Sequence, residues 1–275
     1  TETCSDELLK AASSTGRELG VPVRSHFAQY PHETISNLKE LGMSPVERLA
    51  NLEVLGPDLT LTHAIYLRGH PEIGEGQYED DLKLLADSGT NVGHTPVVFS
   101  RQGIFLRSFQ SYVDAGVNVA LGTDTVPPDL LAEMRMVTTM SKVADADPTS
   151  GNAAEVFNSA TLGGAKALGR NDIGRLAAGA RADISVFDLR GLHIGVVDDP
   201  ITALIHYANG VDTETVIVDG RTVVENSHVV GLAEAQLQHD AHQAWQRYKL
   251  ELEARDPEGR NIDDLYPPAF PIRKS

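Results

Sequence analysis

The sequence predicts an α/β fold in which four parallel strands precede a small β-rich segment. Two observations support this prediction. Up to about residue 145, short apolar segments alternate with amphipathic segments that carry helix start and stop signals. Beyond Gly169, short β-branched segments replace this alternation, and Asp219-Gly220 between two of them is a hairpin turn signal. The 275 residues suffice for one large domain or two small ones.

Helix signals recur along the first part of the chain. Ser5, ahead of two acidic residues, indicates a helix start, and Gly20 indicates its end. Residues 44–47 form a capping box with Pro45 at the first helical position, and this helix is expected to end at Gly56. Further helices are expected over residues 78–88, 104–115, 130–146, 153–168 and 232–254.

Each predicted strand ends on a polar or ionisable residue. The four strands are expected over residues 21–26, 59–65, 91–95 and 117–122. The residues at or just beyond their ends are, in order, His26, His63, His94 or Thr95, and Asp124. In a (β/α)₈ barrel the carboxyl ends of parallel strands line the active site. We therefore expect three histidines and one aspartate around one rim.

The β-rich segment is expected to contain strands over residues 184–188, 215–218 and 221–224. The Pro-rich tail at residues 266–268 is expected to be extended. His239 and His242, on the predicted helix between these parts, have metal-ligand spacing but no ligand partners nearby in the sequence. We expect both on a solvated helix face.

Composition and charge exclude several functional classes. A net charge of −16 with scattered Lys and Arg argues against nucleic-acid binding. No apolar run approaches the roughly 18–20 residues of a transmembrane helix, and no secretory signal pattern is found. The single cysteine, Cys4, fits a reducing compartment. We expect a cytoplasmic protein with a small-molecule substrate.

Four motifs at the strand ends resemble those of the amidohydrolase superfamily. They are Ser25-His26-Phe27-Ala28-Gln29, Leu61-Thr62-His63-Ala64, Gly93-His94-Thr95-Pro96 and Leu121-Gly122-Thr123-Asp124. In this order they are similar to the motifs on strands five to eight of that family's barrel. The nearest branch contains cytosine deaminases, adenosylhomocysteine deaminases and triazine chlorohydrolases. Stretches between residues 160 and 220 resemble the link into that branch's small β-domain.

The resemblance implies the C-terminal half of a (β/α)₈ TIM-type barrel with part of a small β-sandwich domain. The barrel half is expected over residues 1–170, the partial β-domain over 171–232, and a C-terminal helix with an extended tail over 233–275. We expect Val23, Leu61, Val92 and Val119 to face the barrel interior. The family's His-x-His pair at the end of strand one is not in this sequence. We expect a separate or cleaved polypeptide to supply that pair and strands one to four, which would make the protein an oligomer.

The resemblance also implies a metal site. His26 and Asp124 are expected to bind one divalent ion, with zinc first and iron, manganese or nickel as alternatives. His63 is expected to hydrogen-bond the attacking hydroxide or the substrate's polarised atom, and Asp124 to accept a proton as well. A bound divalent ion lowers the pKa of its water toward about 7. Two ligands rarely hold a catalytic ion, because zinc usually takes three protein ligands and a water.

Two positions depart from the deaminase pattern. Deaminases place a proton-shuttling Glu three residues after the strand-five His, where this sequence has Gln29. An amide cannot exchange a proton as a carboxylate does, so Glu33 is the candidate replacement. Phe99 stands near the position where the relatives have a polar Ser-Asn pair, and with Val97 and Val98 it indicates a more apolar pocket wall. His94 is expected to line the same pocket.

These residues predict a hydrolase that attacks a non-peptide C–N or C–Cl bond of a small heterocycle or amide with metal-activated water. The alternative within enzymes is an amidase or carbamate hydrolase of the same fold, because a shuttle Glu matters less when the leaving group needs little protonation. The alternative outside enzymes is a catalytically silent subunit that stabilises a partner, or a metal-free binding protein.

Overall fold

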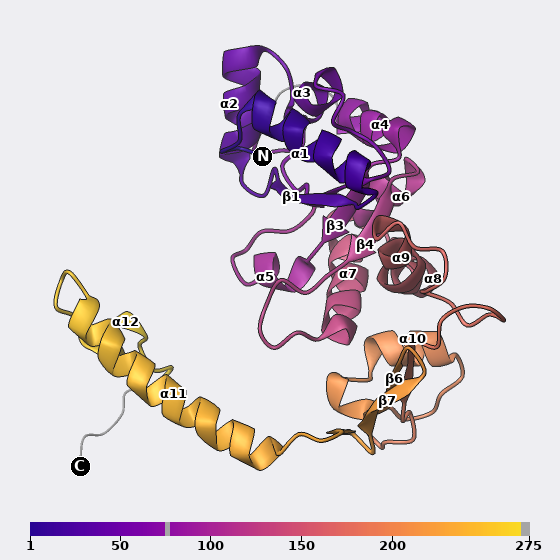
Figure 1. The fold of residues 1–275 in the computed structure, drawn as a ribbon, viewed down its shortest axis with the longest axis vertical. Coiled ribbons are helices and arrows are strands. Elements are labelled where there is room, and N and C mark those ends of the chain that lie inside the picture. Colours follow the sequence, from indigo (N-terminus) through magenta and orange to yellow (C-terminus); the bar gives the residue numbers. More distant parts are fainter. Residues whose placement is uncertain (75–77, 271–275) are drawn as a thin grey trace.

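Two four-stranded sheets organise the chain (Figure 1), in a computed structural model that describes residues 1–74 and 78–270. The first sheet is parallel, in chain order, and comprises β1 (Val23–Phe27), β2 (Leu59–His63), β3 (Asn91–His94) and β4 (Asn118–Leu121). The second is antiparallel and comprises β5 (Ile184–Phe187), β6 (Thr213–Val218), β7 (Arg221–Glu225) and β8 (His228–Val229). The predicted α/β fold with four parallel strands is confirmed.

Helices connect the strands of the parallel sheet. They are α1 (Asp6–Leu19), α2 (Pro31–Leu41), α3 (Pro45–Asn51), α4 (Tyr78–Ser88), α5 (Pro96–Ser100), α6 (Phe109–Asp114), α7 (Leu130–Asp145), α8 (Ala153–Asn158), the π-helical turn η1 (Ser159–Gly163) and α9 (Gly164–Ala167). The C-terminal part adds α10 (Pro200–His206), the 3₁₀ turn η2 (Gly210–Asp212), α11 (Glu234–Arg255) and α12 (Ile262–Leu265).

The two faces of the parallel sheet differ in chemistry. The register places Val23, Leu61, Val92 and Val119 on one face, which we call the helix-covered face. Leu61 and Val92 are 0% exposed there, and α1 approaches so closely that a Cβ on Gly16 would collide with Val23. Our expectation that these four residues face a barrel interior is therefore wrong. Their apolar side chains pack against the apolar sides of the amphipathic helices instead.

The opposite face of the sheet, which we call the polar face, carries polar and small side chains. They are Arg24, His26, Thr60, Thr62, Asn91, Gly93, Asn118 and Ala120. Arg24 and His26 on the outer strand β1 are exposed. This face therefore presents hydrogen-bonding groups and the small residues Gly93 and Ala120, in contrast to the apolar interior that we expected.

Capping residues set the helix starts and correct some predicted ends. Ser44 and Glu47 form both hydrogen bonds of the predicted capping box. That helix ends at Asn51 rather than near residue 56, because Glu53 adopts a φ of 58°. The predicted helix over 104–115 begins only at Phe109, because the Ser108 hydroxyl caps it there. The predicted helix over 153–168 forms as α8, η1 and α9 in succession.

Four helices were not predicted, namely α2, α5, α10 and α12, and the first three have proline in the first turn. Pro31 begins α2, Pro96 begins α5 and Pro200 begins α10. Before α10, Asp199 accepts a hydrogen bond from the Thr202 amide at 2.8 Å, as an N-cap residue does. Proline at the first helical position was the available signal in all three cases.

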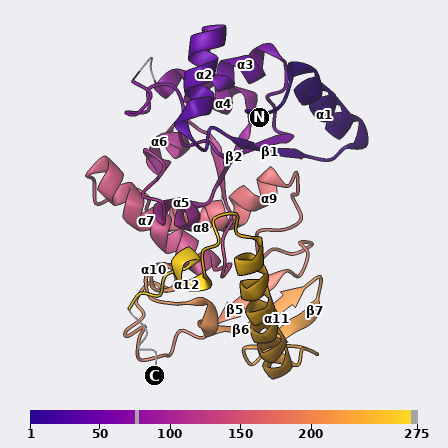
Figure 2. The same cartoon turned by 90° about the vertical axis from the view of Figure 1, so that its left-hand side faces the viewer.

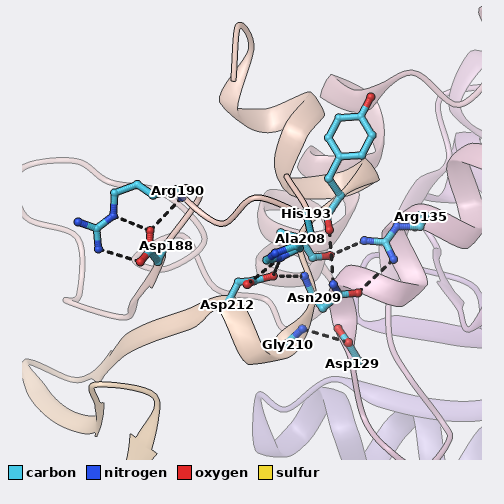
Figure 3. A network of polar contacts seen from close by, with 10 residues as sticks. Asp129, Arg135, Asp188, Arg190, His193, Ala208, Asn209, Gly210 and Asp212 are labelled. Atoms are coloured by element: carbon cyan, nitrogen blue, oxygen red, sulfur yellow. Dashed lines mark hydrogen bonds and ion pairs between the residues drawn. The ribbon is translucent and has the colours of Figure 1, made fainter. Parts of the chain in front are cut away.

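Side chains of α7 hold the loop that leads from α10 into the antiparallel sheet (Figure 3). Arg135 donates to the carbonyl oxygens of Ile205, at 3.0 Å, and of Ala208. Asp129 caps α7 and also accepts from the Gly210 amide at 3.3 Å. The predicted small β-domain is therefore tied to the parallel-sheet part through α7 and α10.

The C-terminal helix α11 extends away from both sheets in Figure 1, and none of its residues is buried. Its predicted existence is confirmed, and α12, which was not predicted, precedes residues 266–268, the expected extended tail, which form neither helix nor strand. Trp245 of α11 contacts Tyr248 and Tyr266, which holds α12 beside α11 as Figure 2 also shows. His239 and His242 are exposed, as expected. Within the described part of the chain, every helix is too short or too polar to cross a bilayer.

Candidate active site

The carboxyl ends of β1, β2 and β4 bring His26, His63 and Asp124 together. The imidazole rings of His26 and His63 stack with their centroids 5.4 Å apart. Nε2 of His63 lies 3.8 Å from Oδ2 of Asp124. Strand register explains the first contact, because Phe27 pairs with His63 and His26 precedes it by one residue. The three residues predicted to carry metal and hydroxide chemistry thus share one rim.

Non-glycine residues in the left-handed backbone region turn the chain at these strand ends. The φ angle is 42° at Ala28, 82° at His63, 47° at Ala64 and 43° at Asp124. L-residues rarely adopt such angles, and each costs on the order of 1–3 kcal/mol where the side chain gains nothing from it. Strain of this kind concentrates at functional sites. Here it directs His63 and Asp124 toward each other.

His63 is fixed on one nitrogen and free on the other. Its ring is 1% exposed, and Nδ1 lies 3.1 Å from the Thr95 hydroxyl. The ring of Phe99 packs edge-on against it, with centroids 4.7 Å apart. Nε2 is buried and has no hydrogen-bond partner within residues 1–74 and 78–270. Because Thr95 holds Nδ1, Nε2 is the nitrogen that remains for a ligand.

Burial keeps this imidazole neutral. Loss of solvent lowers the pKa of His63 to about 4, against the opposing effect of Asp124 and with a further lowering by His26. His94 is also buried, at 5% exposed, and burial lowers its pKa to about 3, with His63 lowering it further. At neutral pH both rings are therefore uncharged, so they act through hydrogen bonds and packing rather than through charge.

Phe99 and Tyr30 form an aromatic wall beside His63. Phe99 is 4% exposed and meets the Tyr30 ring edge-on, with centroids 6.2 Å apart. The Tyr30 hydroxyl donates to Gln102 at 3.2 Å, which ties the β1 loop to the segment after α5. Phe99 thus contributes an apolar side chain beside His63, and Tyr30 is an additional aromatic residue that the sequence reasoning missed.

Gln29, at the position of the deaminases' shuttle Glu, and Glu33, its candidate replacement, are held very differently. Glu33 is 3% exposed, and its carboxylate accepts from the Ala28 amide at 2.7 Å and from the Thr1 hydroxyl. Ala28 is the left-handed residue that ends β1, so Glu33 supports that turn. Gln29 is half-buried, and its amide has no hydrogen-bond partner in the described ranges. The structure therefore leaves the Gln29 side chain available and gives Glu33 a structural contact.

The donors at this rim fit part of a divalent-metal site. Imidazole nitrogen and carboxylate oxygen are normal zinc ligands, and the buried, unpaired Nε2 of His63 lies beside them. Across the described residues, however, no three His, Cys, Asp or Glu side chains form a group that could hold a metal. His26 and Asp124 can supply two donors, and a complete site needs at least one more.

Comparison with known proteins identifies the family of this chain. Residues 2–223, which include every candidate site residue, match the model of the amidohydrolase family. The chain belongs to the amidohydrolase family. This amidohydrolase is 33% identical over 236 residues to a 5-methylthioadenosine/S-adenosylhomocysteine deaminase of Pyrococcus abyssi, across 84% of this chain and 53% of that protein. It is 32% identical over 245 residues to a 5'-deoxyadenosine deaminase of Methanothermobacter thermautotrophicus, across 85% and 55% respectively.

Solved structures resemble this amidohydrolase over most of its length. An adenosine deaminase from Xanthomonas campestris with bound zinc superimposes with a TM-score of 0.80 and 25% identity, across 89% of this chain and 55% of that one. An atrazine chlorohydrolase from Arthrobacter aurescens, complexed with zinc, gives a TM-score of 0.76 and 26% identity, across 87% and 52%. The chain spans about half the length of the curated relatives that it matches.

Proposed function

We propose that this amidohydrolase chain contributes part of the active site of a metal-dependent hydrolase that attacks a C–N or C–Cl bond of a small heterocycle or amide. The names of its relatives, which are deaminases and a chlorohydrolase, support this class of bond. The observation that carries the proposal is His63. It is a buried imidazole with an unpaired Nε2, stacked on His26 and 3.8 Å from Asp124.

Each residue of the rim has a part in the proposed chemistry. A divalent ion, zinc first, would supply water activated for attack near neutral pH. His26 and Asp124 would hold that ion, and the half-exposed Asp124 carboxylate can also accept a proton. The Thr95 hydroxyl can accept a hydrogen bond from Nδ1 of His63 or donate one to it, and this sets whether Nε2 accepts or donates. When Thr95 donates, Nε2 carries the proton and can donate to the substrate atom on which negative charge grows. Phe99 keeps water from the other side of that ring.

The remaining metal ligands are proposed to come from a second polypeptide, or a cleaved segment, with a His-x-His pair. It would complete a (β/α)₈ barrel by pairing with β1 and β4, whose outer edges have no strand neighbour among the described residues. A cavity of ≈ 1080 Å³ between α7, η1 and the edge strand β5 gives further support. It is lined by apolar side chains that include Met134, Phe157, Ile184 and Leu204. An added strand could pair with β5 and fill this cavity.

We retain the cytoplasm as the proposed location of this chain, because its single cysteine, Cys4, fits a reducing compartment.

An amidase or carbamate hydrolase is the second candidate because Gln29 cannot shuttle a proton and the Glu33 carboxylate is bound to the Ala28 amide. A leaving group that needs little protonation suits such a site better than ammonia does.

Metal analysis of the native assembly tests the proposed function. We expect about one divalent ion per completed barrel, as in sites with three protein ligands and a water. His26→Ala and Asp124→Ala should each lose the ion and the activity. His239→Ala, on the exposed face of α11, is the matched control and should keep both. A native assembly that contains no metal would contradict the proposal and favour a silent subunit that stabilises its partner.

A further inference from the structure

The short helix α5 and its flanking residues contact two parts of the candidate site. On its N-terminal side, the Thr95 hydroxyl meets Nδ1 of His63 at 3.1 Å, and within the helix Phe99 packs against the same ring. On its C-terminal side, Arg101 donates to the Thr125 hydroxyl at 2.8 Å, immediately after Asp124. The position of α5 therefore decides where the His63 ring lies.

Glu133 of α7 binds α5 from outside the rim. Its Oε2 accepts from the Val97 amide at 2.9 Å, and the side chain is 1% exposed. Val97 lies midway between Thr95 and Phe99, the two residues that fix the His63 ring. In the described part of the chain, three side chains form hydrogen bonds to the backbone of residues 95–99. Ser100 and Gln102 belong to the same segment, and Glu133 is the one that comes from another element.

Burying the Glu133 carboxyl costs free energy, and the hydrogen bond to the Val97 amide offsets part of that cost. Oε1 of Glu133 is buried without a hydrogen-bond partner among the described residues. Burial raises the pKa of Glu133 to about 7, against the lowering effects of the Val97 amide and Arg101. An apolar side chain of similar size would avoid the desolvation cost but would leave the Val97 amide unpaired. What the carboxyl contributes is the acceptor for that amide.

We propose that Glu133 is a positioning residue for His63, acting through the Val97 amide and α5. The inference deepens the proposed function, since the orientation of His63 matters most if its Nε2 meets a substrate. Without the acceptor, the N-terminal turn of α5 is free to move, and Thr95 and Phe99 move with it. Both contacts that set the ring's tilt and its Nδ1 partner then loosen together, while His26 and Asp124 keep their places on β1 and after β4.

The test compares three substitutions in the native assembly. Glu133→Met removes the acceptor with little change of volume, and Glu133→Asp withdraws it by one methylene. Glu133→Gln keeps an acceptor oxygen for the Val97 amide. The readouts are the imidazole NMR signals of labelled histidines, with His63 assigned by its loss in His63→Gln, together with metal content, kcat and KM. Glu133→Asp keeps the comparison possible if Glu133→Met fails to fold.

We expect Glu133→Met and Glu133→Asp to move the His63 imidazole signals and to lower kcat by about tenfold or more, with little change in KM or metal content. Glu133→Gln should retain the His63 signals and most of kcat. Unmoved His63 signals in both Met and Asp variants would overturn the inference, and so would a Gln variant as impaired as Met. The NMR readout needs no turnover. Shifted signals in an assembly without metal or activity would therefore refute the proposed function and leave the positioning role intact.

Discussion

At the scale of single residues, the candidate site is distinguished by which polar atoms remain unpaired. Nε2 of His63 and the amide of Gln29 have no hydrogen-bond partner in the described ranges, whereas the carboxylate of Glu33 is bound on both oxygens. An unpaired buried group costs free energy unless a ligand satisfies it. His63 is therefore the side chain best placed to meet a ligand, the half-buried Gln29 remains available, and Glu33 is placed to hold the backbone.

A Gln29→Glu variant should keep its metal and react faster with substrates that have poor leaving groups. A carboxylate at this position can pass a proton to the departing group, an effect typically of about 10²–10⁴-fold, whereas an amide cannot. Substrates with good leaving groups should gain little. Steady-state rates on a matched pair of such substrates measure the difference. Equal rates for the variant and the parent on both substrates would show that a side chain at position 29 is not placed for proton transfer.

A Glu33→Gln variant should lose stability rather than chemistry. The carboxylate accepts from the Ala28 amide on one oxygen and from the Thr1 hydroxyl on the other, whereas glutamine has a single acceptor oxygen, and the loss of an acceptor for a buried group costs about 1–3 kcal/mol. Urea unfolding of the assembly measures the change. Glu40→Gln, exposed on the same helix, is the control and should be neutral. A large loss of kcat at unchanged stability would instead identify Glu33 as the replacement acid.

Sequence reasoning located the strand-end residues of the site but not those that support them. His26, His63 and Asp124 stand at the ends of apolar runs, a signal that needs no tertiary information. Glu133 gave no such signal, because a Glu in the first turn of an amphipathic helix is ordinarily solvated. Its burial depends on α5, which packs over α7 only in the folded chain.

At the scale of elements, short apolar and β-branched segments predicted the strands, whereas two kinds of error remained. The short helices α2, α5 and α10 were missed because proline also marks turns, so its meaning depends on the residues after it. The face of the parallel strands was also assigned wrongly. In a strand such as β2, the alternation separates Leu61 from Thr60 and Thr62 but does not say which set the helices cover.

A matched pair of neighbouring glycines tests how η1 packs on β4. A Cβ added at Gly163 would collide with the carbonyl oxygen of Val119, whereas one added at Gly164 would meet nothing within 4 Å. Gly163→Ala should therefore destabilise the fold by about 1–3 kcal/mol through overpacking. Gly164→Ala should be neutral or stabilising by up to about 1 kcal/mol, because alanine favours a helix. Equal urea midpoints for the two variants would mean that η1 does not contact β4 in this way.

At the scale of the whole molecule, α7, α8 and α10 join the parts that contain the two sheets, and outer strand edges have no strand neighbour among the described residues. The contacts of Asp129 and Arg135 tie α10 and the loop after it to α7 (Figure 3). The edges of β1 and β5 have no strand neighbour among the described residues, and the cavity beside β5 is lined mainly by apolar side chains. Such edges pair readily with other chains.

We predict that this chain, produced alone, will aggregate, and that co-expression with a polypeptide that carries the missing strands and the His-x-His pair will make it soluble. The reason is not an apolar barrel interior, since the polar face carries Thr60, Thr62 and Asn91. It is the pairing capacity of β1 and β5 and the exposed apolar side chains near the cavity, where Leu176 and Val211 are each 80% exposed.

Covering an apolar side chain contributes about 1.5–3 kcal/mol. A few such side chains therefore approach the roughly 5–15 kcal/mol by which a typical domain is stable. Size-exclusion chromatography with light scattering, with and without the partner, measures the outcome. A monodisperse monomer of the chain alone, with a cooperative thermal melt, would contradict this prediction. The edges of β1 and β5 would then have to be closed by contacts within the chain itself.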